Sequence, residues 1–104
     1  MAHQRKYRST TREYHNLNQI VHRRRRQAVI HEIKMARGCA DCGYRGHPVA
    51  LDFDHRPGVD KLFTIGQDAR RKWSEIEAEI EKCDVVCSNC HRIRTYRRNN
   101  PDEL

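Results

Sequence analysis

Four of the five cysteines form two Cys-x-x-Cys pairs, Cys39/Cys42 and Cys87/Cys90, with 44 residues between the pairs. Two such pairs supply four thiolates, the ligand set of a closed structural zinc site, and each tight loop can direct both sulfurs to one point. Two disulfides are the alternative, but the odd cysteine count and the lack of an apolar leader segment argue against them. The spacing therefore predicts structural Zn²⁺, and leaves Cys83 as a small buried apolar residue.

A second group of residues could carry hydrolytic chemistry beside this zinc site. Asp54 offers a hard oxygen ligand, and His91, which directly follows Cys90, offers a nitrogen. Two protein ligands leave positions of a divalent metal open for water and a phosphate oxygen. A histidine can act as a general base at neutral pH, which makes His55 the candidate to deprotonate that water. The alternative is that these residues, like Asp52, are ordinary polar positions.

These motifs together resemble the HNH endonuclease family. The matching elements are CADC, LDFDH, the run EIEKCDVVCSNC and the Cys-His step that follows, and the resemblance covers about residues 39–96. It implies a ββα-metal (His-Me) finger in which Asp54 and His91 hold the catalytic metal and His55 is the general base. It also implies cleavage of DNA to a 5′-phosphate and a 3′-hydroxyl. Small stand-alone members of this family are common in phages and mobile elements.

The chain departs from the family pattern at two positions. The family often has an asparagine about five residues before the third cysteine, where it holds the loop that carries the base, and here that position is Lys82. Asn89 lies inside the second cysteine pair and is no obvious substitute. Some members also have a histidine four residues after the helix histidine, and here that position is Thr95. Mg²⁺ or Mn²⁺ is therefore expected at the catalytic centre rather than Zn²⁺.

The elements that must position these residues predict a small α+β domain. Residues 1–14 are polar and are expected to be mobile, whereas residues 16–37 lack Gly and Pro and predict a long basic helix that stops at Gly38. Residues 48–55 alternate in polarity and predict a strand. Residues 61–66 predict a second strand that pairs back with it as a hairpin.

A shorter helix is expected after this hairpin. Ser74 is its predicted N-cap, with Glu77 completing a capping box, and Ile76, Ile80 and Cys83 form one apolar face. The second cysteine pair then opens a final helix. The order of cysteine loop, hairpin and second cysteine loop at a helix start predicts a treble-clef finger.

The positive charge is concentrated at the two ends of the chain. Residues 1–38 have a net charge of +8, residues 39–91 of −3 and residues 92–104 of +2, for a total of +7. This pattern predicts a basic DNA-binding extension over 1–38, a nuclease domain over 39–98 and a short polar tail over 99–104. The expected phosphate contacts are Arg23, Arg24, Arg25, Arg26, Arg92, Arg94, Arg97 and Arg98.

Length and composition exclude several classes of protein. A chain of 104 residues with 37% apolar residues can form one small domain. Because its apolar core is small, the fold needs additional stabilisation, such as a bound zinc ion. It has no apolar run of membrane-spanning length, so a cytoplasmic protein is expected, bacterial or a phage protein in its host.

The predicted function is a metal-dependent DNA endonuclease of low sequence specificity, which nicks or cleaves double-stranded DNA. The alternatives are a non-catalytic treble-clef nucleic-acid-binding module and an accessory protein of a packaging or recombination machine. The sequence leaves monomer and homodimer open.

Overall fold

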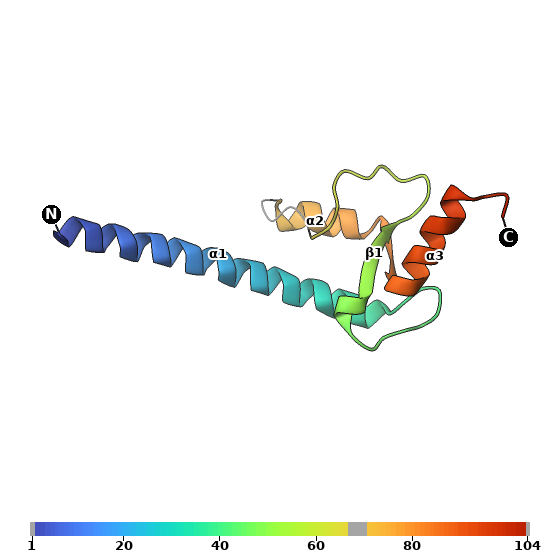
Figure 1. Cartoon of the computed structure of the whole chain (residues 1–104), viewed down its shortest axis with the longest axis horizontal. Helices are drawn as coiled ribbons and strands as arrows, with labels where there is room; N and C mark the ends of the chain where they lie inside the picture. Colours follow the sequence, from blue (N-terminus) through green and yellow to red (C-terminus); the bar gives the residue numbers. More distant parts are fainter. Residues whose placement is uncertain (1, 67–70, 104) are drawn as a thin grey trace.

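The computed structural model describes residues 2–66 and 71–103, with side chains from Arg12 onward. Within these residues the chain forms three α-helices, one short 3₁₀ turn and a two-stranded sheet (Figure 1). In chain order these are α1 (Ala2–Arg37), η1 (Pro48–Ala50), β1 (Leu51–His55), α2 (Trp73–Ile80), β2 (Cys83–Cys87) and α3 (Ser88–Asn99). The predicted small α+β class is thereby confirmed.

Helix α1 is longer than predicted and projects from the rest of the molecule (Figure 1). The whole molecule, with α1 included, measures 70 × 28 × 23 Å. Its end is as predicted. Gly38 adopts a positive φ of 67°, a conformation that glycine tolerates, and its N–H donates to the Lys34 carbonyl at 2.8 Å. The helix was expected to begin near residue 16, but it already begins at Ala2. No Gly or Pro interrupts this stretch, so nothing in it stops the helix.

The predicted hairpin between residues 48–55 and 61–66 is wrong, because residues 61–66 form no strand and β1 pairs instead with β2. The pairing is antiparallel and runs from Leu51 opposite Cys87 to His55 opposite Cys83. Leu51, Val85 and Val86 are almost fully buried in this arrangement. The two valines are strand-favouring residues that bring apolar surface to the core.

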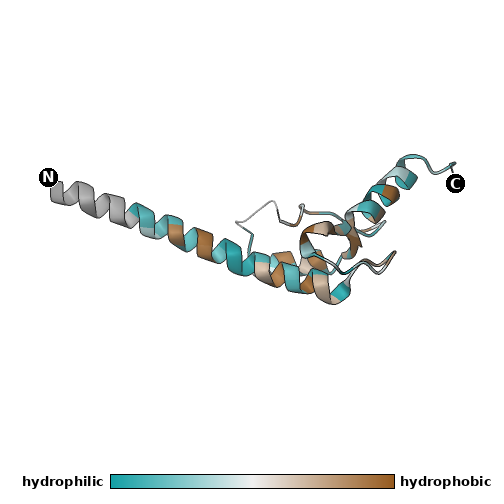
Figure 2. Ribbon diagram, turned by 60° about the horizontal axis from the view of Figure 1, so that its bottom comes forward, coloured by the Kyte–Doolittle hydropathy of each residue, from teal (hydrophilic) through white to brown (hydrophobic). Residues whose placement is uncertain are grey.

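The core lies where the C-terminal end of α1 meets the sheet. Buried Cys39, Leu51, Val85, Val86 and Cys87 form one cluster, and Figure 2 shows apolar residues gathered in this part of the molecule. Much of the projecting part of α1 is polar by comparison (Figure 2).

Helix α2 packs against β2 through Ile76 and Ile80. The predicted Ser74 cap is wrong, because the N-cap position is Lys72 and no side chain caps the helix. Cys83 is buried as predicted, at the start of β2. No helix among the described residues has the length and apolar character that a membrane span requires.

Candidate functional site

Cys39, Cys42, Cys87 and Cys90 converge as their spacing predicts. Their four Sγ atoms all lie within 4.8 Å of one another, and those of Cys42 and Cys87 are 3.7 Å apart. The N–H of Cys42 donates to the Cys39 sulfur and the N–H of Cys90 to the Cys87 sulfur, each at 3.4 Å. Four thiolates of this kind fit a tetrahedral metal such as zinc. The fifth cysteine, Cys83, is not part of the cluster.

The pKa shifts differ among the cysteines: hydrogen bonds within the cluster raise the pKa values of Cys42 and Cys90, whereas that of Cys39 is lowered. Burial would raise the pKa of the Cys39 thiol, but backbone N–H donors around it outweigh burial and lower the pKa to about 6. A thiol with a low pKa is ready to bind metal as the thiolate. In contrast, burial and then the charge of Glu79 raise the pKa of Cys83 to about 11. Cys83 is therefore a protonated core residue at neutral pH.

The second cysteine pair also positions His91. The Cys87 sulfur accepts the Cys90 N–H and so serves as the N-cap of α3. His91 lies in the first turn of this helix, and its ring reaches β1. Its Nδ1 atom lies 3.1 Å from Oδ2 of Asp52, and its Nε2 atom 3.7 Å from Oδ1 of Asp54. Asp52, which the sequence favoured as a plain polar position, is thus a neighbour of His91 in the site. The alternation of β1 was the available signal, because residues two apart share a face.

Asp54 is a buried carboxylate held by two arginines of α3. Arg98 donates to both of its oxygens at 2.8 and 2.7 Å, and Arg94 donates to Oδ2 at 3.0 Å. Burial would raise the pKa of Asp54, but these hydrogen bonds outweigh it and hold the pKa below its usual value. Only 4% of Asp54 is exposed, so two cationic partners neutralise a charge that is largely shielded from water.

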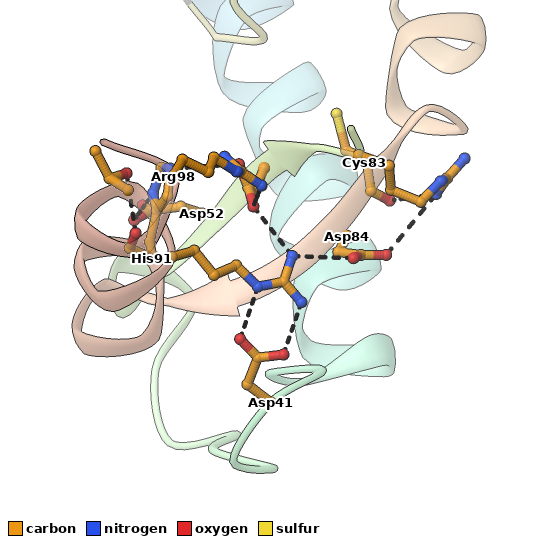
Figure 3. Close-up of polar contacts among 10 residues, drawn as sticks. Asp41, Asp52, Cys83, Asp84, His91 and Arg98 are labelled. Atoms are coloured by element: carbon orange, nitrogen blue, oxygen red, sulfur yellow. Dashed lines mark hydrogen bonds and ion pairs between the residues drawn. The ribbon is translucent and has the colours of Figure 1, made fainter. Parts of the chain in front are cut away.

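Arg94 connects three segments of the chain. Besides Asp54 it donates to Asp84 of β2 at 3.0 Å and to both oxygens of Asp41 in the first cysteine loop at 2.7 and 2.6 Å (Figure 3). Asp54 and Asp84 face each other across the sheet, where two like charges would repel. Arg94 offsets that repulsion and ties the cysteine loop to both strands.

His55, the last residue of β1, contacts a residue that sequence reasoning missed. Its Nε2 atom lies 2.7 Å from Oε2 of Glu79, which is only 1% exposed. Glu79 also accepts from the Lys82 ammonium at 3.0 Å and from the Leu62 N–H at 3.1 Å. The signal was present, since Glu79 is an acid directly before Ile80 on the buried side of a helix, where an unpaired charge is costly.

Lys82 holds the segment that follows His55. Its ammonium donates to the Asp60 carbonyl at 2.8 Å in addition to Glu79. Burial would raise the pKa of Glu79, but the hydrogen bonds from Lys82, His55 and Leu62 outweigh it and lower the pKa to about 2. Glu79 is therefore ionised at neutral pH, so it can accept a hydrogen bond from His55 but cannot donate one.

The predicted site residues share one cleft of about 530 Å³, called here the site cleft. Asp52, Asp54, His55 and His91 lie on its wall, together with basic side chains that include Lys34 and Arg98. Two carboxylates, two imidazoles and cationic groups thus line one open space. Such a set can bind a hard cation, position an anion and move a proton.

Some of the arginines predicted to contact phosphates are paired with carboxylates, and most of the others are exposed. Arg94 and Arg98 are engaged with carboxylates, as described above. Arg92 and Arg97 are exposed on α3, and on α1 Arg23, Arg24 and Arg25 are exposed, whereas Arg26 is half-buried and donates to the Arg71 carbonyl at 2.7 Å.

Comparison of the chain with protein-family models, with curated proteins and with solved structures finds no match. The function is therefore inferred from the geometry of the site.

Proposed function

We propose that this chain is a metal-dependent endonuclease of the HNH type, built on a treble-clef finger that a four-cysteine zinc staples. The observation that carries the proposal is the site cleft, which His55, Asp54 and His91 line together, with His91 directly following Cys90 of the cysteine cluster. These are the three residues that the sequence motifs single out for phosphodiester hydrolysis. A basic chain with such a cleft suits DNA as its substrate.

The residues of the cleft fit a divalent cation. Asp54 is a buried carboxylate whose oxygens already attract two cationic groups, and the Nε2 atom of His91 lies 3.7 Å from it. Asp54 and His91 would hold the cation. Mg²⁺ and Mn²⁺ prefer oxygen ligands such as the carboxylate of Asp54, and His91 would add one nitrogen ligand. When bound, such a cation stabilises the negative charge that develops on the phosphate oxygens.

The side chains around this position then have separate tasks. Glu79 accepts the Nε2–H of His55, so the lone pair of Nδ1 is left to take a proton from water. Asp52 fixes the ring of His91 through its Nδ1 atom. Arg92 and Arg97 on α3 and the arginines of α1 are available for phosphates along the DNA, and give affinity that depends on salt and carries little sequence information.

Nicking of supercoiled plasmid with Mg²⁺ or Mn²⁺ tests this function. We expect wild type to convert the plasmid to nicked product, and His55→Ala to be slower by about 10² to 10⁴-fold. His22→Ala, an exposed histidine on α1, is the matched control and should nick like wild type. Equal rates for His55→Ala and wild type would refute the general-base role.

One observation favours a second candidate, a non-catalytic nucleic-acid-binding module. The four cysteines are the one set of three or more metal-ligating side chains that converge within the described residues, and Asp54 is already paired with arginines. In that case Asp54, Arg94 and Arg98 are a structural ion network. A wild-type protein that binds zinc and DNA but nicks no plasmid with either cation would favour this candidate.

A further inference from the structure

A second hollow continues from the site cleft along α1. It has a volume of about 230 Å³ and shares Lys34, Phe53 and Ile65 with the site cleft, so the two hollows adjoin. One wall is α1 and the other is the segment around Ile65 and Gly66. This hollow is called here the α1 groove.

The α1 side of the groove is cationic. Arg23, Arg26 and Lys34 line it, and their spacing of three and eight residues keeps them on one face of the helix. Arg24 and Arg25 are turned from Arg23 by about 100° and 200° around the helix axis, and neither lines the groove. The run of four arginines is thus divided into a pair that faces the groove and a pair that does not.

The floor of the groove is apolar. Ile30, Phe53 and Ile76 line it, and the Lys34 ammonium lies 5.3 Å from the centre of the Phe53 ring. A row of cations beside apolar and aromatic side chains matches a nucleic-acid strand that has both phosphates and unpaired bases to offer. A duplex would bring its phosphates to the groove but not its bases, because they are stacked inside.

We propose that the α1 groove binds a single strand of DNA and leads its backbone into the site cleft, an inference that rests on the proposed endonuclease function. Arg23 contacts the strand at the outer end, Lys34 at the junction and Lys61 in the site cleft. Unpaired bases contact the floor between them. The preferred substrate is then DNA with a frayed, gapped or unpaired segment rather than an intact duplex.

Binding of a fluorescently labelled oligonucleotide, single-stranded or as its duplex, tests this with the full chain and no added divalent cation. We expect wild type to prefer the single strand. Arg23→Gln combined with Lys61→Gln, two exposed positions, should weaken single-strand binding by roughly tenfold or more at 0.1 M salt. It should also reduce the slope of log affinity against log salt by about 1.4, the value for two phosphate contacts.

Arg24→Gln combined with Arg25→Gln removes the same charge from the other side of the helix. This variant should retain the single-strand preference and lose less single-strand affinity than the groove pair. If the two double variants lose equal single-strand affinity, or if wild type prefers the duplex, the proposal that the α1 groove binds a single strand is refuted. Zinc content checks that each variant is folded. Because binding is measured without cleavage, a wild type that prefers single strands but nicks nothing would refute the nuclease and not the groove.

Discussion

The Nε2 atom of His55 lies 2.7 Å from Oε2 of Glu79, and this contact joins the end of β1 to the buried face of α2. A carboxylate there selects the imidazole tautomer with hydrogen on Nε2, which leaves Nδ1 as the free base. The proposed nuclease therefore depends on a residue that touches neither metal nor phosphate. Glu79 is a positioning residue.

Glu79→Gln should lower the nicking rate by about 10²-fold, the scale of a misplaced catalytic group. Nitrogen NMR of His55 should at the same time show a mixed tautomer population, which a purely structural role would not produce. Glu77→Gln, an exposed position on the same helix, is the control and should change neither readout. An unaltered tautomer population in Glu79→Gln would exclude this role.

Glu79 also predicts how stability depends on pH. Its pKa is lowered from an ordinary 4.5 to about 2, so the folded state binds its proton less readily than the unfolded state. The resulting stabilisation is complete above about pH 4.5 and is lost as the pH falls from there toward 2. Urea unfolding at a series of pH values should give a flatter curve for Glu79→Gln than for wild type in this window. Parallel curves would mean that Glu79 is not the group responsible.

Removal of one zinc ligand should release the metal and unfold the domain. Cys42→Ser is the cleanest change, because Cys42 is exposed and its loss leaves no cavity in the core. We expect purified wild type to contain one zinc per chain, and the variant to contain much less and to melt at lower temperature. Cys83→Ala removes a buried cysteine outside the cluster and should keep its zinc. Wild-type protein without zinc would disprove the metal site.

The pairing of Arg98 with Asp54 predicts competition with a divalent cation. Arg98→Gln removes one of the cations that compete for the carboxylate, so Mn²⁺ should bind at least about tenfold more tightly, since a charge-assisted hydrogen bond contributes roughly 1.5–3 kcal/mol. Titration calorimetry on the zinc-loaded protein measures this. Arg97→Gln, its exposed neighbour, should bind Mn²⁺ like wild type, and Asp54→Asn should abolish binding. Weaker Mn²⁺ binding in Arg98→Gln would contradict the competition.

The features that were predicted correctly from the sequence are those set by the spacing of nearby residues. Each Cys-x-x-Cys loop and the glycine stop are decided within a few residues. The two matching loops then predicted that all four sulfurs meet, although the loops lie 45 positions apart. Pairing of β1 with β2 was missed because residues 61–66 have similar strand propensity and lie nearer in sequence. The burial of Val85 and Val86 favours β2 over residues 61–66 as the partner of β1. That burial depends on how all the elements of the core pack together, which local sequence does not specify.

The candidate site was likewise predicted only in part. The spacing of Asp54, His55 and His91 was informative, whereas their supporting residues come from distant segments. Glu79 approaches His55 only because α2 folds back onto the sheet, and Arg94 reaches Asp41 across 53 positions. No local pattern specifies such contacts, although an acid on an apolar helix face is a signal that a buried partner exists.

The five-residue ladder of β1 and β2 has cysteine loops at one end and His55 at the other. Leu51 pairs with Cys87 and His55 with Cys83, so the length of the strands sets the distance between the cysteine cluster and His55. A shift of β1 by one residue would turn Asp52 and Asp54 to the opposite face of the sheet. Loops and the projecting helix can accept changes in length during evolution or engineering, while this spacing has to stay constant.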